Sequence, residues 1–166
     1  MISKPPELGL KSAEEWAREF LGYFERVRFE FQRVQTIWFP VQGSTVHGDH
    51  PAKQLTVGTS AFISLVIPRE INQVKEVVVR LIPSTTGTID WTANCSYGGK
   101  NEDESAYTAT ATANGLAVTD DRITEIDLTS LFIAVRADDQ VGVEFVLDAV
   151  TTTTDVYILG LYFKYK

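Results

Sequence analysis

The sequence predicts a mainly β protein, an antiparallel β-sandwich or jelly roll, preceded by one N-terminal amphipathic α-helix. Three observations lead to this fold class. From residue 36 onward threonine, valine and isoleucine dominate, and turn-forming residues recur about every ten positions. Segment 89–97 alternates apolar and polar residues, as a strand with one wet face does. Residues 12–26 instead place aromatic side chains every three or four positions, which is the spacing of an amphipathic helix.

The helix has a recognisable start. Residues 1–11 are expected to form an extended lead-in, because Pro5 and Pro6 are incompatible with regular helix. Ser12 and Glu15 then have the spacing of a capping box, in which each side chain binds a backbone N–H that the helix leaves unpaired. We therefore expect the helix to begin next to Ser12.

An apolar stripe follows along the helix with the spacing of a coiled-coil seam about two heptads long. The stripe consists of Trp16, Phe20, Phe24, Val27, Phe31 and Val34. Beyond residue 26 two interpretations stay open, since 27–31 also alternates with period two and is rich in residues that favour strands. Short isolated helices are marginal in water. We therefore expect the stripe to pack on the protein's own sandwich or on copies of the chain.

The remainder of the chain is expected to be strands joined by turns. Strands are predicted at 36–41, 54–57, 60–67, 74–82, 88–97, 105–113, 116–119, 122–128, 131–136, 140–147 and 156–165. Asn114-Gly115 has the composition of a two-residue type I′ hairpin turn. Trp91 and Cys95 share the apolar face of their strand and are expected in the core. Many short strands without intervening helices predict a sandwich.

Length and charge limit the classes of function. The 166 residues fit one folding unit, divided into a lead-in and helix at 1–35 and a β-sandwich body at 36–166. The first 40 residues balance six basic and six acidic groups, whereas the rest hold nine basic and sixteen acidic groups. An acidic body argues against nucleic-acid binding. No apolar run approaches the roughly 20 residues of a membrane span, and no secretory signal is visible, so we expect no membrane insertion.

Catalytic chemistry is poorly represented. The single Cys95 excludes an internal disulfide, and the only histidines are His47 and His50, which leaves little general-base chemistry near neutral pH. We predict that the protein is not an enzyme and needs no cofactor. His47, Asp49 and His50 offer two imidazoles and a carboxylate as possible metal ligands. The structural alternative for this segment is an exposed turn.

Tyr97 and Tyr107 flank a glycine-rich turn at 98–101 and are the candidates for a ligand-binding surface. Apolar faces of sugar rings stack on aromatic side chains, so these tyrosines suggest a carbohydrate-binding β-sandwich module as one possible function. The alternation of residues 89–97 also places Tyr97 on the same strand face as Trp91.

The order of elements also resembles a family of viral proteins. A lead-in helix, a compact Thr/Val-rich body and the ending GLYFKY at 160–165 resemble the head domains of trimeric viral and phage fibres or other virion proteins. The resemblance implies a homotrimer of jelly rolls in a virion, with a role in attachment or assembly and a glycan or other surface receptor as partner. Trp16, Phe20, Phe24, Val27 and Phe31 are the residues expected at the subunit interface.

Overall fold

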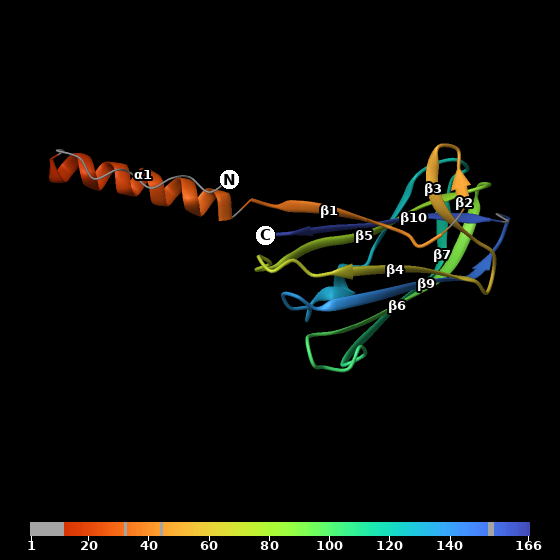
Figure 1. The fold of residues 1–166 in the computed structure, drawn as a ribbon. Coiled ribbons are helices and arrows are strands. Elements are labelled where there is room, and N and C mark those ends of the chain that lie inside the picture. Colours follow the sequence, from red (N-terminus) through yellow and green to blue (C-terminus); the bar gives the residue numbers. More distant parts are fainter. Residues whose placement is uncertain (1–11, 32, 44, 153–154) are drawn as a thin grey trace.

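The computed structural model describes residues 12–31, 33–43, 45–152 and 155–166. Helix α1 is followed by two antiparallel sheets packed face to face, which confirms the predicted fold class (Figure 1). The elements are α1 (Ala13–Phe31), β1 (Gln35–Pro40), β2 (Thr45–His47), β3 (His50–Leu55), β4 (Ser60–Val66), β5 (Val74–Pro83), β6 (Gly87–Gly98), β7 (Tyr107–Val118), β8 (Thr124–Asp127), the 3-10 helix η1 (Thr129–Phe132), β9 (Gln140–Val150) and β10 (Val156–Tyr165). Among the described residues, no helix has the length and apolar character that crossing a membrane requires.

The two sheets differ in how their strands are ordered. The six-stranded sheet has the order β2-β3-β10-β5-β8, and β1 also pairs with β10. One edge of β10 pairs with β5, and its other edge is shared by β3 along 156–158 and by β1 along 160–165. The four-stranded sheet has the order β4-β9-β6-β7. Strand β10 is therefore the centre of one sheet, while β9 and β6 are the centre of the other.

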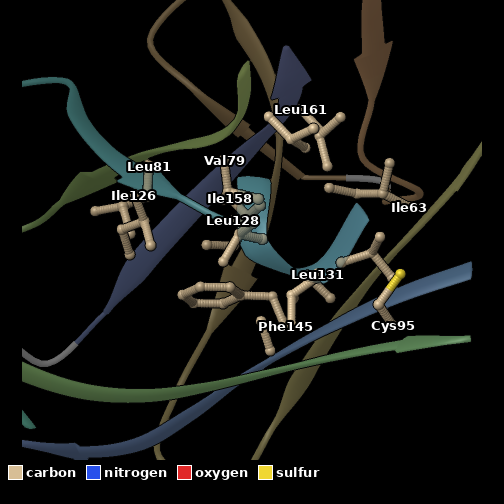
Figure 2. Close-up of a cluster of buried hydrophobic side chains, with 14 of the residues drawn as sticks. Ile63, Val79, Leu81, Cys95, Ile126, Leu128, Leu131, Phe145, Ile158 and Leu161 are labelled. Atoms are coloured by element: carbon tan, nitrogen blue, oxygen red, sulfur yellow. The ribbon is translucent and has the colours of Figure 1, made fainter. Parts of the chain in front are cut away.

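The core fills the space between the two sheets. Figure 2 shows side chains from both sheets and from the segment around η1 pointing toward one another. The labelled residues are Ile63, Val79, Leu81, Cys95, Ile126, Leu128, Leu131, Phe145, Ile158 and Leu161. Trp91 and Cys95 are buried as predicted, and the ring of Trp91 stacks on Phe145 with 5.6 Å between centroids.

Helix α1 begins as the sequence predicts and stands apart from the sheets. Ser12 Oγ accepts a hydrogen bond from the Glu15 N–H (3.3 Å), and Glu15 Oε2 accepts one from the Ser12 N–H (3.0 Å), which confirms the capping box. The helix continues to Phe31, so the strand alternative for 27–31 is wrong. Figure 1 shows α1 extending away from the sandwich beyond the start of β1, so the helix does not pack on its own body.

The predicted hairpin at Asn114-Gly115 is wrong, because β7 runs through both residues and stays paired with β6. Asp90 of β6 faces the two of them, which makes this a β-bulge. Gly115 has a φ of +70°, which glycine adopts without strain. Its N–H donates to Asp90 Oδ1 at 2.6 Å. The same dipeptide chemistry that favours a turn thus supplies the bulge.

The predicted strand at 131–136 is also wrong, because this segment begins in the 3-10 helix η1 and continues as a turn. Leu131 and Phe132 are both buried although they are adjacent, which an alternating strand with one wet face does not allow. Thr129 anchors the turn, because its Oγ1 accepts a hydrogen bond from the Val77 N–H at 2.9 Å. Segment 129–132 therefore covers one end of the core.

Two phenylalanine truncations on the four-stranded sheet test the division between inner and outer faces. Phe145→Ala on the inner face is expected to lower the free energy of unfolding by about 3–5 kcal/mol, because it leaves a cavity in a closed core. Phe62→Ala on the outer face is the matched control and is expected to stay within about 1 kcal/mol of the parent. Urea unfolding measures both, and equal losses would contradict this assignment of faces.

Candidate functional site

The outer face of the four-stranded sheet is hollowed into a groove of about 600 Å³. Strand alternation turns the apolar residues of this sheet toward the core, and so it turns the polar ones into the groove. The outward side chains and the glycine that line the groove are Gln42, Phe62, Ser64, Asn94, Ser96, Thr108, Thr110, Gly142 and Glu144. The groove crosses every strand of the sheet and is also lined by Gln42, which precedes β2, so its ligand contacts would come from five separate segments of the chain.

A hydrogen-bonded row crosses the middle of the groove. Pairing between strands places Phe62 opposite Glu144, Glu144 opposite Asn94, and Asn94 opposite Thr110. Asn94 Nδ2 donates to Glu144 Oε2 (3.2 Å), and Thr110 Oγ1 donates to Asn94 Oδ1 (3.0 Å). Ser60 Oγ donates to the other carboxylate oxygen of Glu144 (2.8 Å). These bonds fix the orientation of the carboxylate and the amide before any ligand arrives.

The row keeps hydrogen-bonding capacity for a ligand. An ionised carboxylate accepts about four hydrogen bonds, and Glu144 uses one on each oxygen. The amide of Asn94 has two N–H donors, and one of them is directed at Glu144. An acceptor and a donor therefore lie side by side on the sheet surface. A ligand that both donates and accepts hydrogen bonds at adjacent positions would complement them.

Gly142 opens the floor of the groove. Pairing places it between Ser64 on β4 and Ser96 on β6, in the row next to the central one. A Cβ atom at Gly142 would lie 3.6 Å from Ser96 Oγ, which is ordinary van der Waals contact. The glycine is therefore not required by crowding, and its effect is to leave space above the sheet. Phe62, which is 53% exposed, adds an apolar surface beside this space.

The charge of the groove limits what it can bind or do. Among the described residues that line it, Glu144 is the only charged one. Without lysine or arginine there, and with a net charge of −7 over the chain, a phosphate or sulfate ligand would be repelled. Hydrolysis of a glycosidic bond by the common mechanisms needs two carboxyl groups. The arrangement suits binding of a neutral polar ligand.

The predicted ligand surface at Tyr97 and Tyr107 lies outside this groove, with Tyr97 buried and Tyr107 half-buried. Tyr97 is only 3% exposed, so its ring offers no face to a ligand, and burial raises its pKa. Its ring stacks on that of Tyr107 with 5.4 Å between centroids. The guanidinium of Arg136 lies 5.1 Å from the Tyr107 ring centroid and donates to the Tyr107 hydroxyl at 2.6 Å. Core packing therefore covers the ring of Tyr97, whereas the ring of Tyr107 is half-buried beside Arg136.

The predicted metal ligands do not converge. His47 and His50 face each other across the turn between β2 and β3, as an ordinary hairpin places them. His47 Nε2 lies 3.0 Å from Asp121 Oδ1, and its ring lies 4.5 Å from that of Tyr157. In the described part of the chain, no group of three or more His, Cys, Asp or Glu side chains is placed to hold a metal ion. Asp49 therefore lies in a turn and is not part of any metal-binding cluster among the described residues.

The predicted interface residues form a stripe along α1. The rings of Trp16 and Phe20 lie 5.1 Å apart, and those of Phe20 and Phe24 lie 6.2 Å apart. Phe24 is 61% exposed, whereas Val27 is half-buried. The side chain of Phe31 lies outside the described residues. The helix stripe is separate from the groove and does not contribute to it.

Sequence reasoning did not identify Asn94, Gly142 and Glu144 as groove residues. Polar residues that alternate along a strand look like an ordinary wet face, and no sequence signal tells which strands are neighbours. Gly142 and Glu144 were the available hint, because they interrupt the otherwise apolar run at 141–147. A glycine inside a strand often marks a place where a ligand or another backbone approaches closely.

No protein-family model matches the chain, and no curated protein matches it either. Solved structures match at low identity. An insecticidal delta-endotoxin from Bacillus thuringiensis has a TM-score of 0.49 and 12% identity over 80% of this chain and 24% of that chain. A family two carbohydrate esterase from Cellvibrio japonicus has a TM-score of 0.45 and 12% identity over 81% of this chain and 34% of that chain.

A third match is a carbohydrate-binding module, CBM36, solved in complex with calcium and xylotriose. Its TM-score is 0.38 and its identity 12%, over 78% of this chain and 98% of that chain. This chain spans about a quarter of the length of the toxin and about a third of the length of the esterase. None of these three matches is a viral or phage fibre head.

Cys95 lies under the groove with its thiol in the core, and its chemistry can be tested directly. Burial raises the pKa of this thiol to about 12, so it stays protonated and unreactive at neutral pH. We expect no reaction with a thiol reagent such as dithionitrobenzoate at pH 8 in the folded protein, and complete reaction in denaturant. Because Cys95 is the only cysteine, colour release reports on it alone. Rapid labelling of the folded protein would contradict its burial.

Proposed function

We propose that this protein binds a neutral carbohydrate chain in the groove and does not modify it. The observation that carries this proposal is the row in which exposed Phe62 lies opposite Glu144, and Glu144 is bonded to Asn94. A sugar ring has an apolar C–H face and a rim of hydroxyl groups that both donate and accept hydrogen bonds. The ring of Phe62 suits the apolar C–H face, and the carboxylate–amide pair of Glu144 and Asn94 suits the hydroxyl groups.

The shape and the polarity of the groove favour a chain of sugars over a small ion or a peptide. The groove crosses the sheet from β4 to β7, and the hydroxyl groups of Ser64, Ser96 and Thr108 line the row beside the central one. Glu144 and Asn94 would hold one ring by adjacent hydroxyls, and the hydroxyl groups of Ser96 and Thr108 would meet the next. Because the donors and acceptors are already oriented, little side-chain entropy is lost on binding.

Binding is tested by titrating cellotetraose, xylotriose, β-1,4-galactotriose and panose into the protein in a calorimeter. We expect at least one of these neutral oligosaccharides to bind. Glu144→Gln removes the charge of an acceptor and Asn94→Ala removes a donor, and each is expected to weaken binding about tenfold or more. Gly142→Val fills the floor of the groove and is expected to abolish binding there while the sheet stays folded, because valine favours strands.

Val66→Ala is the matched control for this groove. Val66 is exposed on the same outer face of β4 as Phe62 but does not line the groove. The affinity of Val66→Ala for the oligosaccharide should equal that of the parent, and circular dichroism should show that every variant is folded. Oligosaccharide binding at one site per chain that survives Gly142→Val unchanged would overturn the groove as the binding site.

A second candidate function is self-association through α1, for which the position of the helix is the specific observation. The helix extends away from the sandwich, and its stripe of Trp16, Phe20 and Phe24 packs on neither sheet (Figure 1). A 19-residue helix with large apolar side chains in water is marginal alone. Packing against the same stripe on other copies would bury these rings. A homotrimer is the state we propose, with the sandwich bodies carried at one end of the bundled helices.

The mass of the protein in solution tests this second candidate. Light scattering after size exclusion at two protein concentrations is expected to give about three chains for the parent. Phe24→Asp places a charge in the buried seam and is expected to reduce the mass to one chain, because a buried unpaired charge is very costly. The melting of the sandwich should change little, since α1 does not pack on it.

Arg18→Asp is the control for that experiment, because it introduces the same aspartate on an exposed position of the helix. The control is expected to keep the mass of the parent. A parent mass of one chain would reject self-association, and a dimer would reject the trimer only. An unchanged mass for Phe24→Asp would show that the stripe is not the contact.

A further inference from the structure

An indole ring on the outer face of the other sheet lies directly against the backbone. Trp38 on β1 reaches over Gly160 of β10, so that a Cβ atom at Gly160 would lie 2.6 Å from Trp38 Cζ2 and 3.0 Å from Cη2. Gly160 also has a φ of +153°, which side-chain-bearing residues rarely adopt, and it lies at a register shift in β10. The atom nearest to such a Cβ would be the Phe39 carbonyl oxygen, so glycine is required there for both the backbone of β1 and its indole to lie this close to β10.

The neighbours of Trp38 leave its indole as the aromatic surface that faces solvent. Tyr162 lies opposite Trp38 in the β1–β10 pair, with 4.7 Å between ring centroids. The guanidinium of Arg80 lies 4.0 Å from the centroid of the Tyr162 ring and covers it. Trp38 remains 38% exposed. A ring held against the backbone on one side and open on the other is a preformed stacking surface.

A matched donor and acceptor lie beside this surface. Arg80 Nε and Nη2 both contact Glu125 Oε1, at 2.7 Å and 2.5 Å. Arg80 Nη1 and Glu125 Oε2 have no hydrogen-bond partner among the residues that the structure describes. The two charges cancel, so the pair favours neither an anion nor a cation. It offers one N–H group and one carboxylate oxygen to adjacent polar groups of a ligand.

The stacking surface and Arg80 line one hollow of about 280 Å³, and Glu125 lies beside Arg80 without lining it. Its lining consists of Trp38, Pro40, His50, Pro51, Arg80, Ile123, Leu159 and Tyr162. It has about half the volume of the groove and lies on the outer face of the opposite sheet. Its size suits a short ligand and not a chain that crosses a whole sheet.

We propose that this hollow is a second carbohydrate site, which takes the pyranose ring of a neutral sugar on Trp38. The apolar face of the ring stacks on the indole, and two adjacent hydroxyl groups bind Arg80 Nη1 inside the hollow and Glu125 Oε2 beside it. The net charge of −7 and the balanced ion pair make a neutral ligand more favourable than an acidic one. This inference rests on residues other than those of the groove and stands independently of it.

Tryptophan fluorescence tests the second site without involving the groove. In a Trp16→Phe background the remaining indoles are Trp38 and the buried Trp91. The same four oligosaccharides are titrated, and at least one is expected to change the emission in a saturable manner. Adding Trp38→Phe should remove that emission change. In the calorimeter, Trp38→Ala should weaken binding at this site about tenfold or more, as truncation of a central aromatic contact does.

Three further measurements separate the possible outcomes. Gly142→Val should leave the emission change intact. Oligosaccharide binding that gives no emission change and is lost in Gly142→Val would support the groove and overturn the second site. An emission change that survives Trp38→Phe, or no emission change with any of the four sugars, would also overturn it. A lower solution mass for Trp38→Ala would assign this face to contact between copies and reject the sugar site. Glu125→Gln, which keeps the fold but unbalances the ion pair, should weaken the emission response as well.

Discussion

The register of β9 between β4 and β6 is the constraint on which the outer surface of the molecule depends. Burial of the alternate residues Val141, Val143, Phe145 and Leu147 fixes that register, because a slip by one residue would turn all of them to water. The side chains at the intervening positions must then point to the outer face of the sheet. Glu144 meets Asn94 and Gly142 meets Ser96 for the same reason. The core therefore determines the arrangement of the groove without contributing a polar side chain to it.

Local signals in the sequence were reliable where the structure they describe is local. The capping box at Ser12 needs residues three apart, and the alternation of 89–97 needs one strand, so both were predictable. The Asn114-Gly115 turn and the strand at 131–136 were wrong because each depends on distant partners. The first is decided by continued pairing of β7 with β6, and the second by the bond from Val77 to Thr129. Tertiary contacts outweighed local preference at both places.

The groove was less predictable than the fold, because all of its residues except Gln42 come from four strands whose order the sequence does not reveal. Each contributing strand looks like an ordinary wet face when it is read alone. The conspicuous aromatic residues pointed elsewhere, and Tyr97 proved to be a core residue. The outer face of the six-stranded sheet illustrates the same limit, since the need for Gly160 is visible only when Trp38 of β1 lies over β10. A site assembled from distant segments leaves little trace in any one of them.

The connection between α1 and the sandwich determines how a mechanical load would enter the body. Figure 1 shows α1 continuing beyond the start of β1, and β1 is paired along its whole length with β10, from Gln35 opposite Tyr165 to Pro40 opposite Gly160. Hydrogen bonds in such a pair run across the strands. A pull directed through the helix would act along β1 and would stretch these bonds together, in shear, instead of opening them one after another. If copies are joined through their helices while the bodies hold a surface, this junction would resist tension by sharing it over the full strand.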